Sequence, residues 1–276
     1  MNDRPDSALL LPDERTAIRE HLTRSYAGVF TEDDVERALD DYVGFTFSDG
    51  MLRLVIEHTP APIRLLDIGS GYGAFVLRAR QSDIDATGVE IAPFEVEFAR
   101  SRLRRMRPED DPEQVYLSGD ALCLDLPEQS FDVVTLWNVI EHIDDYASLF
   151  SRVHELLRPG GRAYIVCPNY TSFRPEAHYQ VPWRPFLSRT AAIKRLRRFG
   201  KDPSFFETSI FTRTNWGTLR QLKRLDFELA ELYCSIRMDL SLTNLATVLK
   251  HPVAALRFYN PFKYAVLAIG RRKQAN

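Results

Sequence analysis

L-L-D-I-G-S-G-Y-G-A-F, residues 65–75, is the stretch that decides the fold. An apolar run of strand length, Ile63–Ile68, is followed by glycines at alternate positions, Gly69, Gly71 and Gly73, and then by a helical pattern. Glycines let the backbone turn tightly and let a ligand approach the peptide groups closely. The amides that open the next helix favour partial negative charge. The stretch therefore predicts a strand, a ligand-binding turn and a helix.

An acid at the end of this strand makes the turn more specific. Asp67 completes a D-x-G-x-G-x-G spacing that resembles motif I of the class I S-adenosylmethionine-dependent methyltransferases. The resemblance implies that the acid and the turn hold the amino-acid end of S-adenosylmethionine, through Asp67, Gly69, Ser70, Gly71 and Gly73. The same residues fit the looser G-x-G-x-x-A dinucleotide fingerprint, which alone is a weak signal. A tight turn without a ligand is the structural alternative.

The second expected strand, 85–91, also ends at an acid. Glu90 is placed to accept hydrogen bonds from both ribose hydroxyls, and we assign the adjoining Ile91 to the same cofactor site. A solvated strand-end carboxylate is the alternative. The helix expected over Pro93–Met106 carries four arginines and is followed by a fifth, Arg107, and we expect them to form a solvated outer face.

The third expected strand, Gln114–Ser118, leads into the segment that the resemblance assigns to adenine. Asp120 would accept from the exocyclic amino group, and a neighbouring backbone amide, that of Ala121, would bond a ring nitrogen. Asp125 is a competing candidate because it lies in the same loop.

The next apolar run, Phe131–Leu136, is typical of a central parallel strand covered on both faces. It leads into W-N-V-I-E-H-I, residues 137–143, at the end of the strand, where open α/β sheets bind ligands, and Asn138 is assigned to the cofactor. A helix over 146–157, the turn R-P-G-G and a fifth strand over 162–167 follow. The alternating order predicts an α/β fold, a doubly wound, mostly parallel seven-stranded sheet of the Rossmann-like methyltransferase type.

The chain divides into a helical N-terminal extension, residues 1–62, and a methyltransferase domain, residues 63–276. In the extension Thr31 and Asp34 predict a capping box, and a second helix covers about 49–58. Tyr42 and Phe45 are candidate ligand contacts, with ordinary packing as the favoured alternative. The domain carries two insertions, at about 168–211 and 237–262. The first is basic and aromatic, so we expect its arginines to bind an anionic acceptor, on which Tyr179 or Trp183 would stack.

The last elements are a sixth strand over 226–233 and an antiparallel final strand over 263–269. The apolar core around the final strand is too short to span a membrane. The apolar segment 239–258, inside the second insertion, is expected to be helical and to pack on the domain or touch a membrane surface.

The composition indicates the class of protein and the cellular compartment to expect. The 276 residues are 45% hydrophobic and 27% charged, with a net charge of -2, as in an ordinary globular protein. Cys123, Cys167 and Cys234 show no metal-ligand spacing and are expected to be reduced thiols. The N-terminus has no signal-peptide pattern. We therefore expect a cytoplasmic location, with peripheral membrane contact as a further hypothesis.

Catalysis by this class is attack of an acceptor oxygen or nitrogen on the sulfonium methyl carbon, and a hydroxyl acceptor benefits from a base. His142 is one candidate base, and His178, in the first insertion, is the second. Glu141-His142 resembles the E-H segment of ubiquinone-pathway O-methyltransferases and of a metal-dependent RNA-end methyltransferase family. Those relatives carry an acid where this chain has Asn138, so no metal is predicted.

The predicted function is therefore S-adenosylmethionine-dependent methyl transfer, most simply to an oxygen of a small-molecule, glycan or lipid-linked acceptor. The alternatives are an RNA or protein methyltransferase and a non-catalytic cofactor-binding or scaffold protein. Nucleic acid ranks below small molecules as a partner, although a basic aromatic patch can bind it.

Overall fold

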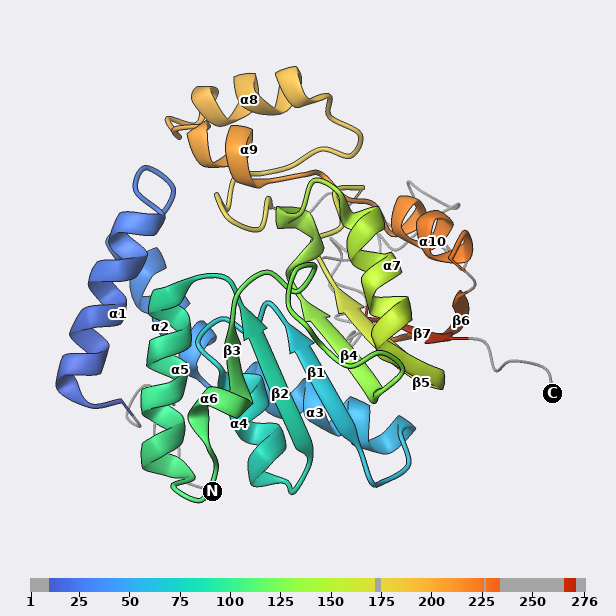
Figure 1. Ribbon diagram of the computed structural model, residues 1–276. Coiled ribbons are helices and arrows are strands. Elements are labelled where there is room, and N and C mark those ends of the chain that lie inside the picture. Colours follow the sequence, from blue (N-terminus) through green and yellow to red (C-terminus); the bar gives the residue numbers. More distant parts are fainter. Residues whose placement is uncertain (1–9, 172–174, 226, 234–265, 272–276) are drawn as a thin grey trace.

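The computed structural model describes residues 10–171, 175–225, 227–233 and 266–271. Its strands form one sheet in the order β3-β2-β1-β4-β5-β7-β6 (Figure 1). β1 to β5 pair in parallel, and β7 is antiparallel to both of its neighbours. The prediction of an α/β fold with a mostly parallel Rossmann-like sheet is confirmed. The strands are β1 Arg64–Ile68, β2 Asp85–Glu90, β3 Tyr116–Ser118, β4 Phe131–Trp137, β5 Leu157–Val166, β6 Phe227–Tyr233 and β7 Val266–Arg271.

Helices cover both faces of this sheet. α3, α4 and α5 pack on one face through a core that includes Val55, Val76 and Leu103. α7 and α10 pack on the other through Phe150 and Leu222. The helices are α1 Pro12–Ser25, α2 Glu32–Val43, α3 Thr46–His58, α4 Ala74–Gln81, α5 Pro93–Met106, α6 Pro112–Val115, η2 Ile140–His142 (a 3-10 turn), α7 Tyr146–Leu156, α8 Arg189–Arg198, α9 Ser204–Ser209 and α10 Asn215–Lys223.

The order of the strands fixes where a ligand can bind. β1 lies between β2 and β4, so the chain reverses direction across the sheet at this point. All seven residues of β4 are buried, as its continuous apolar run predicts. The carboxyl ends of β1 and β4 therefore flank the crevice in which doubly wound folds bind their ligands.

The N-terminal helices close this crevice from outside. The capping box of α2 is confirmed, because Thr31 Oγ1 accepts from the amide of Asp34 and the Asp34 carboxylate accepts from the amide of Thr31. Apolar residues of α1 and α2 pack on Tyr72, in the glycine turn, and on Phe98 of α5. Residues 12–43 are thus attached directly to the turn.

One arginine of α5 contradicts the expected solvated face. Arg102 is buried, donates to the carbonyl of Val43 at 2.6 Å, and places its guanidinium 4.5 Å from the ring centre of Phe45. It joins the end of α2 to α5. This contact also covers Phe45, so the ordinary packing that the sequence favoured for this ring over a ligand contact is confirmed.

Two strand boundaries differ from the sequence prediction. The third strand begins only at Tyr116, because Asp111 caps a helical turn that Pro112 opens. The fifth strand begins at Leu157 and contains the R-P-G-G segment, which a register shift opposite Phe131–Val133 accommodates. The helix predicted over 239–258 lies outside the described residues.

The first insertion forms a small unit of its own above the sheet (Figure 1). Tyr179 and Trp183 are buried there with Phe206 of α9, and Val29 of the N-terminal extension packs into the same cluster. The prediction that Trp183 or Tyr179 stacks on an acceptor is therefore wrong, because their rings form the core of the insertion. Within the described residues, no helix has the length and apolarity needed to cross a membrane.

Candidate functional site

A cavity of about 1170 Å³ opens at the carboxyl ends of β1, β2 and β4. Its walls come from the glycine turn, the segment after β4, helices α2 and α3, and a short part of the insertion. Sites for one small molecule typically measure about 300–1,000 Å³. The volume therefore suits two ligands side by side.

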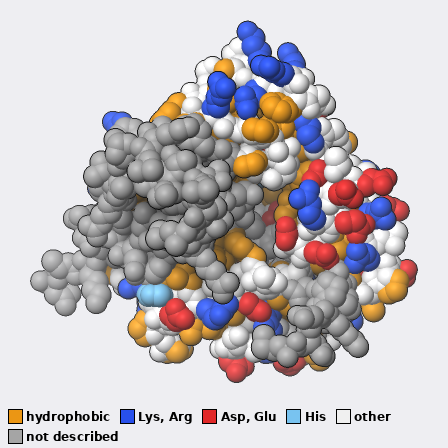
Figure 2. All heavy atoms as spheres, turned by 180° about the vertical axis from the view of Figure 1, so that it is seen from behind, with side chains coloured by type: hydrophobic (Ala, Val, Ile, Leu, Met, Phe, Trp, Pro, Cys, Tyr) orange, Lys and Arg blue, Asp and Glu red, His pale blue; other side chains and the backbone are white. Residues whose placement is uncertain are grey.

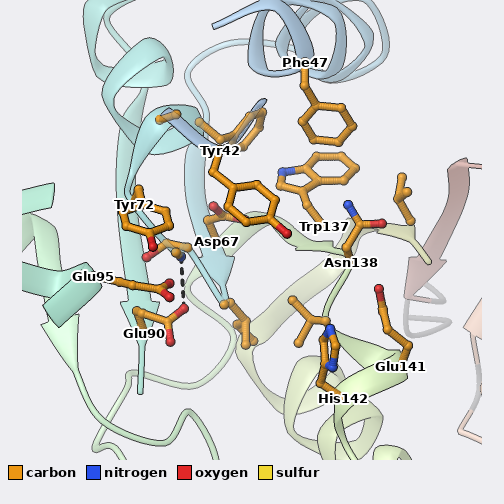
Figure 3. Close-up of a pocket in the computed structure, with 18 of the residues that line it drawn as sticks. Tyr42, Phe47, Asp67, Tyr72, Glu90, Glu95, Trp137, Asn138, Glu141 and His142 are labelled. Carbon is orange, nitrogen blue, oxygen red and sulfur yellow. Dashed lines mark hydrogen bonds between the residues drawn. The ribbon is translucent and has the colours of Figure 1, made fainter. Parts of the chain in front are cut away.

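The glycine turn is tied to the end of β2. The amides of Gly69 and Ser70 both donate to the carbonyl of Val89, at 2.8 and 3.1 Å. Gly71 has φ +51° and donates its N–H to Glu90 Oε2 at 3.0 Å, the dashed line in Figure 3. The glycines thus expose backbone to the cavity, and the turn is already bonded to the acid predicted for ribose.

Glu90 carries three backbone hydrogen bonds. Besides the Gly71 amide, its carboxylate accepts from the amides of Ile91 and Ala92, at 2.8 and 2.9 Å. A carboxylate offers about four lone-pair sites. About one remains, so Glu90 can accept from one ribose hydroxyl without rearrangement rather than from both.

Asp67 is a buried carboxylate at the floor of the cavity. Asp67 is only 1% exposed, and its carboxylate accepts a hydrogen bond from Thr135 Oγ1 at 2.6 Å. Burial raises the pKa of Asp67 to about 7. The hydroxyls of Ser70 and Tyr72, in the turn beside it, are buried and have no hydrogen-bond partner among the described residues. An ammonium group here would compensate the carboxylate, as the amino-acid end of the cofactor requires.

The structure separates the two candidate acids of the adenine loop. Asp120 and Ala121 line the cavity, whereas Asp125 is absent from its described walls. Asp120 Oδ1 accepts from the amide of Leu122, itself 40% exposed on the wall.

Asn138 follows β4 at the opposite side and also lines the cavity, with φ +57° and its N–H bonded to Val166 at 2.8 Å. Gly73 is the one predicted cofactor residue that is absent from the described walls. A Cβ there would lie 2.6 Å from Ala99 Cβ and 2.8 Å from the Tyr116 ring. Close packing against α5 and β3 therefore accounts for this glycine.

An aromatic wall extends across the cavity from the glycine turn, where Tyr42 stacks on Tyr72 with ring centres 6.1 Å apart. Tyr42 of α2, Phe47 of α3 and Trp137 at the end of β4 line it, with the Phe47 and Trp137 rings edge to face at 6.1 Å (Figure 3). Sequence reasoning found Tyr42 but missed the other two. For Trp137, its place at a central strand's end was the usable signal.

The basic side chains of the insertion lie elsewhere. Figure 2 shows Lys and Arg side chains gathered at the top of the molecule, over α8. The described part of the insertion contributes only Pro168, Ala177, His178 and Gln180 to the cavity wall. Arg189 donates to the carbonyls that end α9, and Arg195 to that of Pro182. The expectation that these arginines hold an anionic acceptor in this cavity is wrong.

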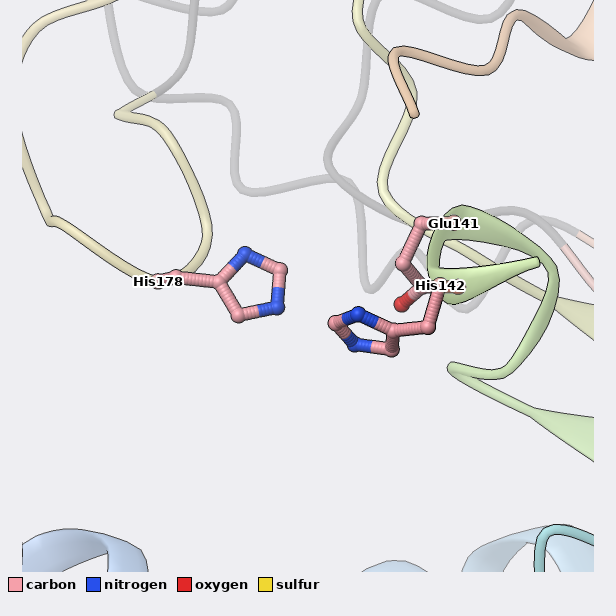
Figure 4. A group of neighbouring side chains, drawn as sticks. All are labelled: Glu141, His142 and His178. Carbon is pink, nitrogen blue, oxygen red and sulfur yellow. The ribbon is translucent and has the colours of Figure 1, made fainter. Parts of the chain in front are cut away.

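The two candidate bases meet in one cluster. One ligand atom from each of Glu141, His142 and His178 lies within 4.8 Å of the others, and the two imidazole centres are 5.1 Å apart (Figure 4). His142 Nδ1 donates to the carbonyl of Ser209 at 2.7 Å, and His178 Nδ1 bonds Glu176 Oε1 at 3.1 Å. Sequence reasoning named both histidines but could not join them, because 35 positions separate them in the chain.

Burial dominates the electrostatics of this cluster. It lowers the pKa of His142 to about 4 and raises the pKa of Glu141 to about 8. Glu141 is fully buried, and no other described residue hydrogen-bonds either of its carboxylate oxygens. Such an unmatched buried group is costly unless a ligand or ion completes it.

The end of the insertion positions the cluster. Arg213 donates from Nε to the carbonyl of Ile140 at 3.1 Å and from Nη2 to that of Asp144 at 2.9 Å, and its guanidinium lies 4.0 Å from the Tyr146 ring centre. The amide of Phe211 donates to the carbonyl of Glu141 at 2.7 Å. These contacts hold the 3-10 turn η2, and the sequence alone gave no indication of them.

Comparison with known proteins places the chain in a family. A family model described as a methyltransferase domain matches residues 35–228, well over half of the chain. Among curated relatives, 27-O-demethylrifamycin SV methyltransferase of Amycolatopsis mediterranei is 29% identical over 55% of this chain and 59% of its own length. Ubiquinone biosynthesis O-methyltransferase of Pseudomonas entomophila is 30% identical over 37% of this chain and 43% of its own length. The matches thus span about half of these relatives.

Solved structures share the fold. A Haemonchus contortus phosphoethanolamine N-methyltransferase 2, in complex with phosphomonomethylethanolamine and S-adenosylhomocysteine, superposes with a TM-score of 0.57. It is 18% identical over 93% of this chain and 60% of its own. The family match, the fold and the cavity at the sheet's switch point agree. The chain belongs to the methyltransferase domain family of the class I S-adenosylmethionine-dependent methyltransferases, and its cofactor is S-adenosylmethionine.

Proposed function

We propose that this protein methylates a hydroxyl oxygen of a small molecule that carries an aromatic or other flat apolar ring. The observation that carries the proposal is the two-sided cavity. One side presents the acids and glycines of the cofactor half, and the other presents an aromatic wall beside the Glu141, His142 and His178 cluster. Aromatic side chains bind flat rings by stacking and edge contacts.

In the cofactor half, each acid has a distinct task. Asp67 pairs with the ammonium of the cofactor's amino-acid end, Glu90 accepts from a ribose hydroxyl, and Asp120 accepts from the adenine amino group. These roles rest on the places of the three side chains along one wall. When bound, S-adenosylmethionine supplies the methyl group and leaves as S-adenosylhomocysteine once the acceptor oxygen has displaced it.

The chain's own residues position the acceptor and take up its proton. Tyr42, Phe47 and Trp137 hold the ring, which fixes the approach of the hydroxyl and excludes water. His178 donates its Nδ1–H to the carboxylate of Glu176, so Nε2 is free to accept the hydroxyl proton, and Glu176 stabilises the resulting imidazolium. In the absence of a bound ion, His178 is therefore the better-supported base, and His142 stays the alternative.

Two observations favour a small molecule over the other classes of acceptor. The names of both curated relatives above, one for a demethylrifamycin and one for ubiquinone biosynthesis, refer to O-methyl transfer or small-molecule pathways. The described walls of the cavity also lack the insertion's arginines, and their one arginine, Arg37, is paired with Asp34, so a phosphorylated or strongly anionic acceptor would find no free guanidinium there. Glycan and lipid-linked acceptors rank second, and RNA and protein rank below them.

The test is transfer of a labelled methyl group. The protein is incubated with methyl-labelled S-adenosylmethionine and a cell extract separated into lipid, small-molecule, protein and RNA pools. We expect label in the small-molecule pool, in a compound that absorbs as an aromatic ring, and less label with Phe47→Ala. Phe199, an exposed aromatic that is not among the described residues lining the cavity, provides the matched control Phe199→Ala. Label confined to RNA or protein would contradict the acceptor class, and cofactor binding without transfer to any pool would favour the scaffold alternative.

A further inference from the structure

We propose that Glu141, His142 and His178 bind one divalent transition-metal ion. One donor atom from each lies within 4.8 Å of the other two (Figure 4). Two imidazoles and one carboxylate form a donor set typical of such ions. Glu141 and His142 are neighbours in the sequence. The third residue, His178, comes from the insertion and meets the segment after β4 only in the folded chain.

The orientation of both histidines prepares them as ligands. A carbonyl oxygen can only accept, so His142 Nδ1, 2.7 Å from the Ser209 carbonyl, must carry the proton. His178 Nδ1 likewise donates to the Glu176 carboxylate. Both rings are therefore held with Nε2 bearing its lone pair. A ligating histidine in a metalloprotein almost always has such a partner on its other nitrogen.

The carboxylate supplies the second, independent observation. Glu141 is 0% exposed, and neither of its oxygens bonds another described residue, although it borders the cavity together with the two histidines. Native proteins rarely leave a buried carboxylate without partners. An ion between Glu141 and the two imidazoles would satisfy it.

The distances require a small adjustment. Ligands about 2.0–2.2 Å from a tetrahedral ion lie roughly 3.3–3.6 Å apart. The side chains would therefore close by about 1 Å from their largest separation. Hydrogen bonds from Arg213 hold η2 in place, whereas His178 is on a short connecting segment of the insertion. We therefore expect His178 to be the residue that moves.

The donor set selects the class of ion. Imidazole nitrogens suit Zn²⁺, Co²⁺, Fe²⁺ and Ni²⁺, whereas Mg²⁺ and Ca²⁺ prefer all-oxygen sites. Three protein ligands leave a coordination position open, as in catalytic sites, and all three residues border the cavity. Under the proposed function, that position is available to the acceptor oxygen, whose acidity the ion would raise. Both histidines would then be ligands rather than bases.

Metal binding is measured without cofactor or acceptor, so that its failure is separate from failure of the proposed function. Untagged full-length protein is stripped with EDTA and dialysed against Zn²⁺ or Co²⁺, and bound metal is counted by mass spectrometry. Co²⁺ also reports its ligands through visible absorption. The variants are Glu141→Gln, His178→Ala and Glu176→Gln. His58→Ala is the matched control, because that histidine also bonds a backbone carbonyl through Nδ1, at 2.8 Å, but lies outside the described cavity wall.

We expect one ion per chain in the wild type and in His58→Ala, with no displacement by millimolar Mg²⁺. Glu141→Gln and His178→Ala should bind at least a hundredfold more weakly, and Glu176→Gln about 10- to 100-fold more weakly, the usual effect of losing an orienting partner. Binding of S-adenosylhomocysteine to each variant checks that it is folded. A wild type that retains no ion, or a folded His178→Ala that binds as the wild type does, would overturn the proposal.

Discussion

Substitution of Gly71 distinguishes an effect on ligand binding from an effect on folding most clearly. Its φ of +51° is in the left-handed region, and a Cβ there would meet only Glu95 Oε2, at 3.4 Å. An L-residue in this conformation costs about 1–2 kcal/mol. For a domain of this size each kcal/mol lowers the melting temperature by about 2–4 °C. Gly71→Ala should therefore melt roughly 2–8 °C below the wild type and remain folded.

Gly71→Ala should affect the binding of the cofactor more than the stability of the fold. The Gly71 amide faces Glu90 at the cavity wall, so the added methyl occupies space needed by the cofactor. Forcing one extra methyl into a close contact costs about 1–3 kcal/mol. Calorimetric titration with S-adenosylmethionine should therefore give a dissociation constant raised roughly 5- to 150-fold.

Two other glycines serve as controls. Gly200 has φ +71°, and a Cβ added there would have no atom within 4 Å, so Gly200→Ala carries the same backbone cost far from the cavity. Gly73→Ala would place its Cβ 2.6 Å from Ala99 Cβ and should instead destabilise the fold. If Gly71→Ala bound S-adenosylmethionine as tightly as Gly200→Ala, the placement of the cofactor on this turn would be refuted.

Acids and histidines of the site give three further predictions. Glu90→Ala should weaken S-adenosylmethionine by about 1–3 kcal/mol in calorimetry, the cost of an unmatched polar partner, and unchanged affinity would move the ribose role elsewhere. Because the pKa of Asp67 is about 7, its carboxylate is increasingly protonated as pH falls from about 7 to about 5.5, and cofactor affinity should fall with it. Asp67→Asn should bind weakly at both pH values, and a wild type with flat affinity over this range would argue against ammonium pairing. His178→Ala should lower turnover roughly a hundredfold or more with cofactor affinity little changed, while His142→Ala should match it only if both histidines act together; full turnover in both variants would leave positioning as the whole mechanism.

The cofactor half could be predicted from the sequence because local rules determine it. Asp67 lies near the end of β1, Glu90 ends β2 and Asp120 follows β3, and parallel strands bring their carboxyl ends to one edge of the sheet. The glycines at alternate positions indicate the turn between β1 and α4. No distant contact is needed to place these residues on one wall.

The acceptor half depends on contacts between distant segments. Phe47 meets Trp137, and His178 meets His142, only because α3 and the insertion fold over the end of β4. Composition was misleading here. The insertion's basic residues favoured an anionic acceptor, but its rings were needed for its own core, and Arg189 ends a helix by bonding its carbonyls. In α5, Arg102 is buried because its guanidinium donates a hydrogen bond to the carbonyl of Val43, at the end of α2, and lies over the ring of Phe45.

Titration of the wild-type chain with S-adenosylhomocysteine in a calorimeter tests the central claim most directly. S-adenosylhomocysteine has no methyl group to transfer, so the heat reports binding alone and needs no knowledge of the acceptor. We predict a saturable heat at one equivalent per chain, reduced in Gly71→Ala and retained in Gly200→Ala. A wild type that gives no binding heat with either S-adenosylhomocysteine or S-adenosylmethionine, at several temperatures, would contradict cofactor binding at this turn.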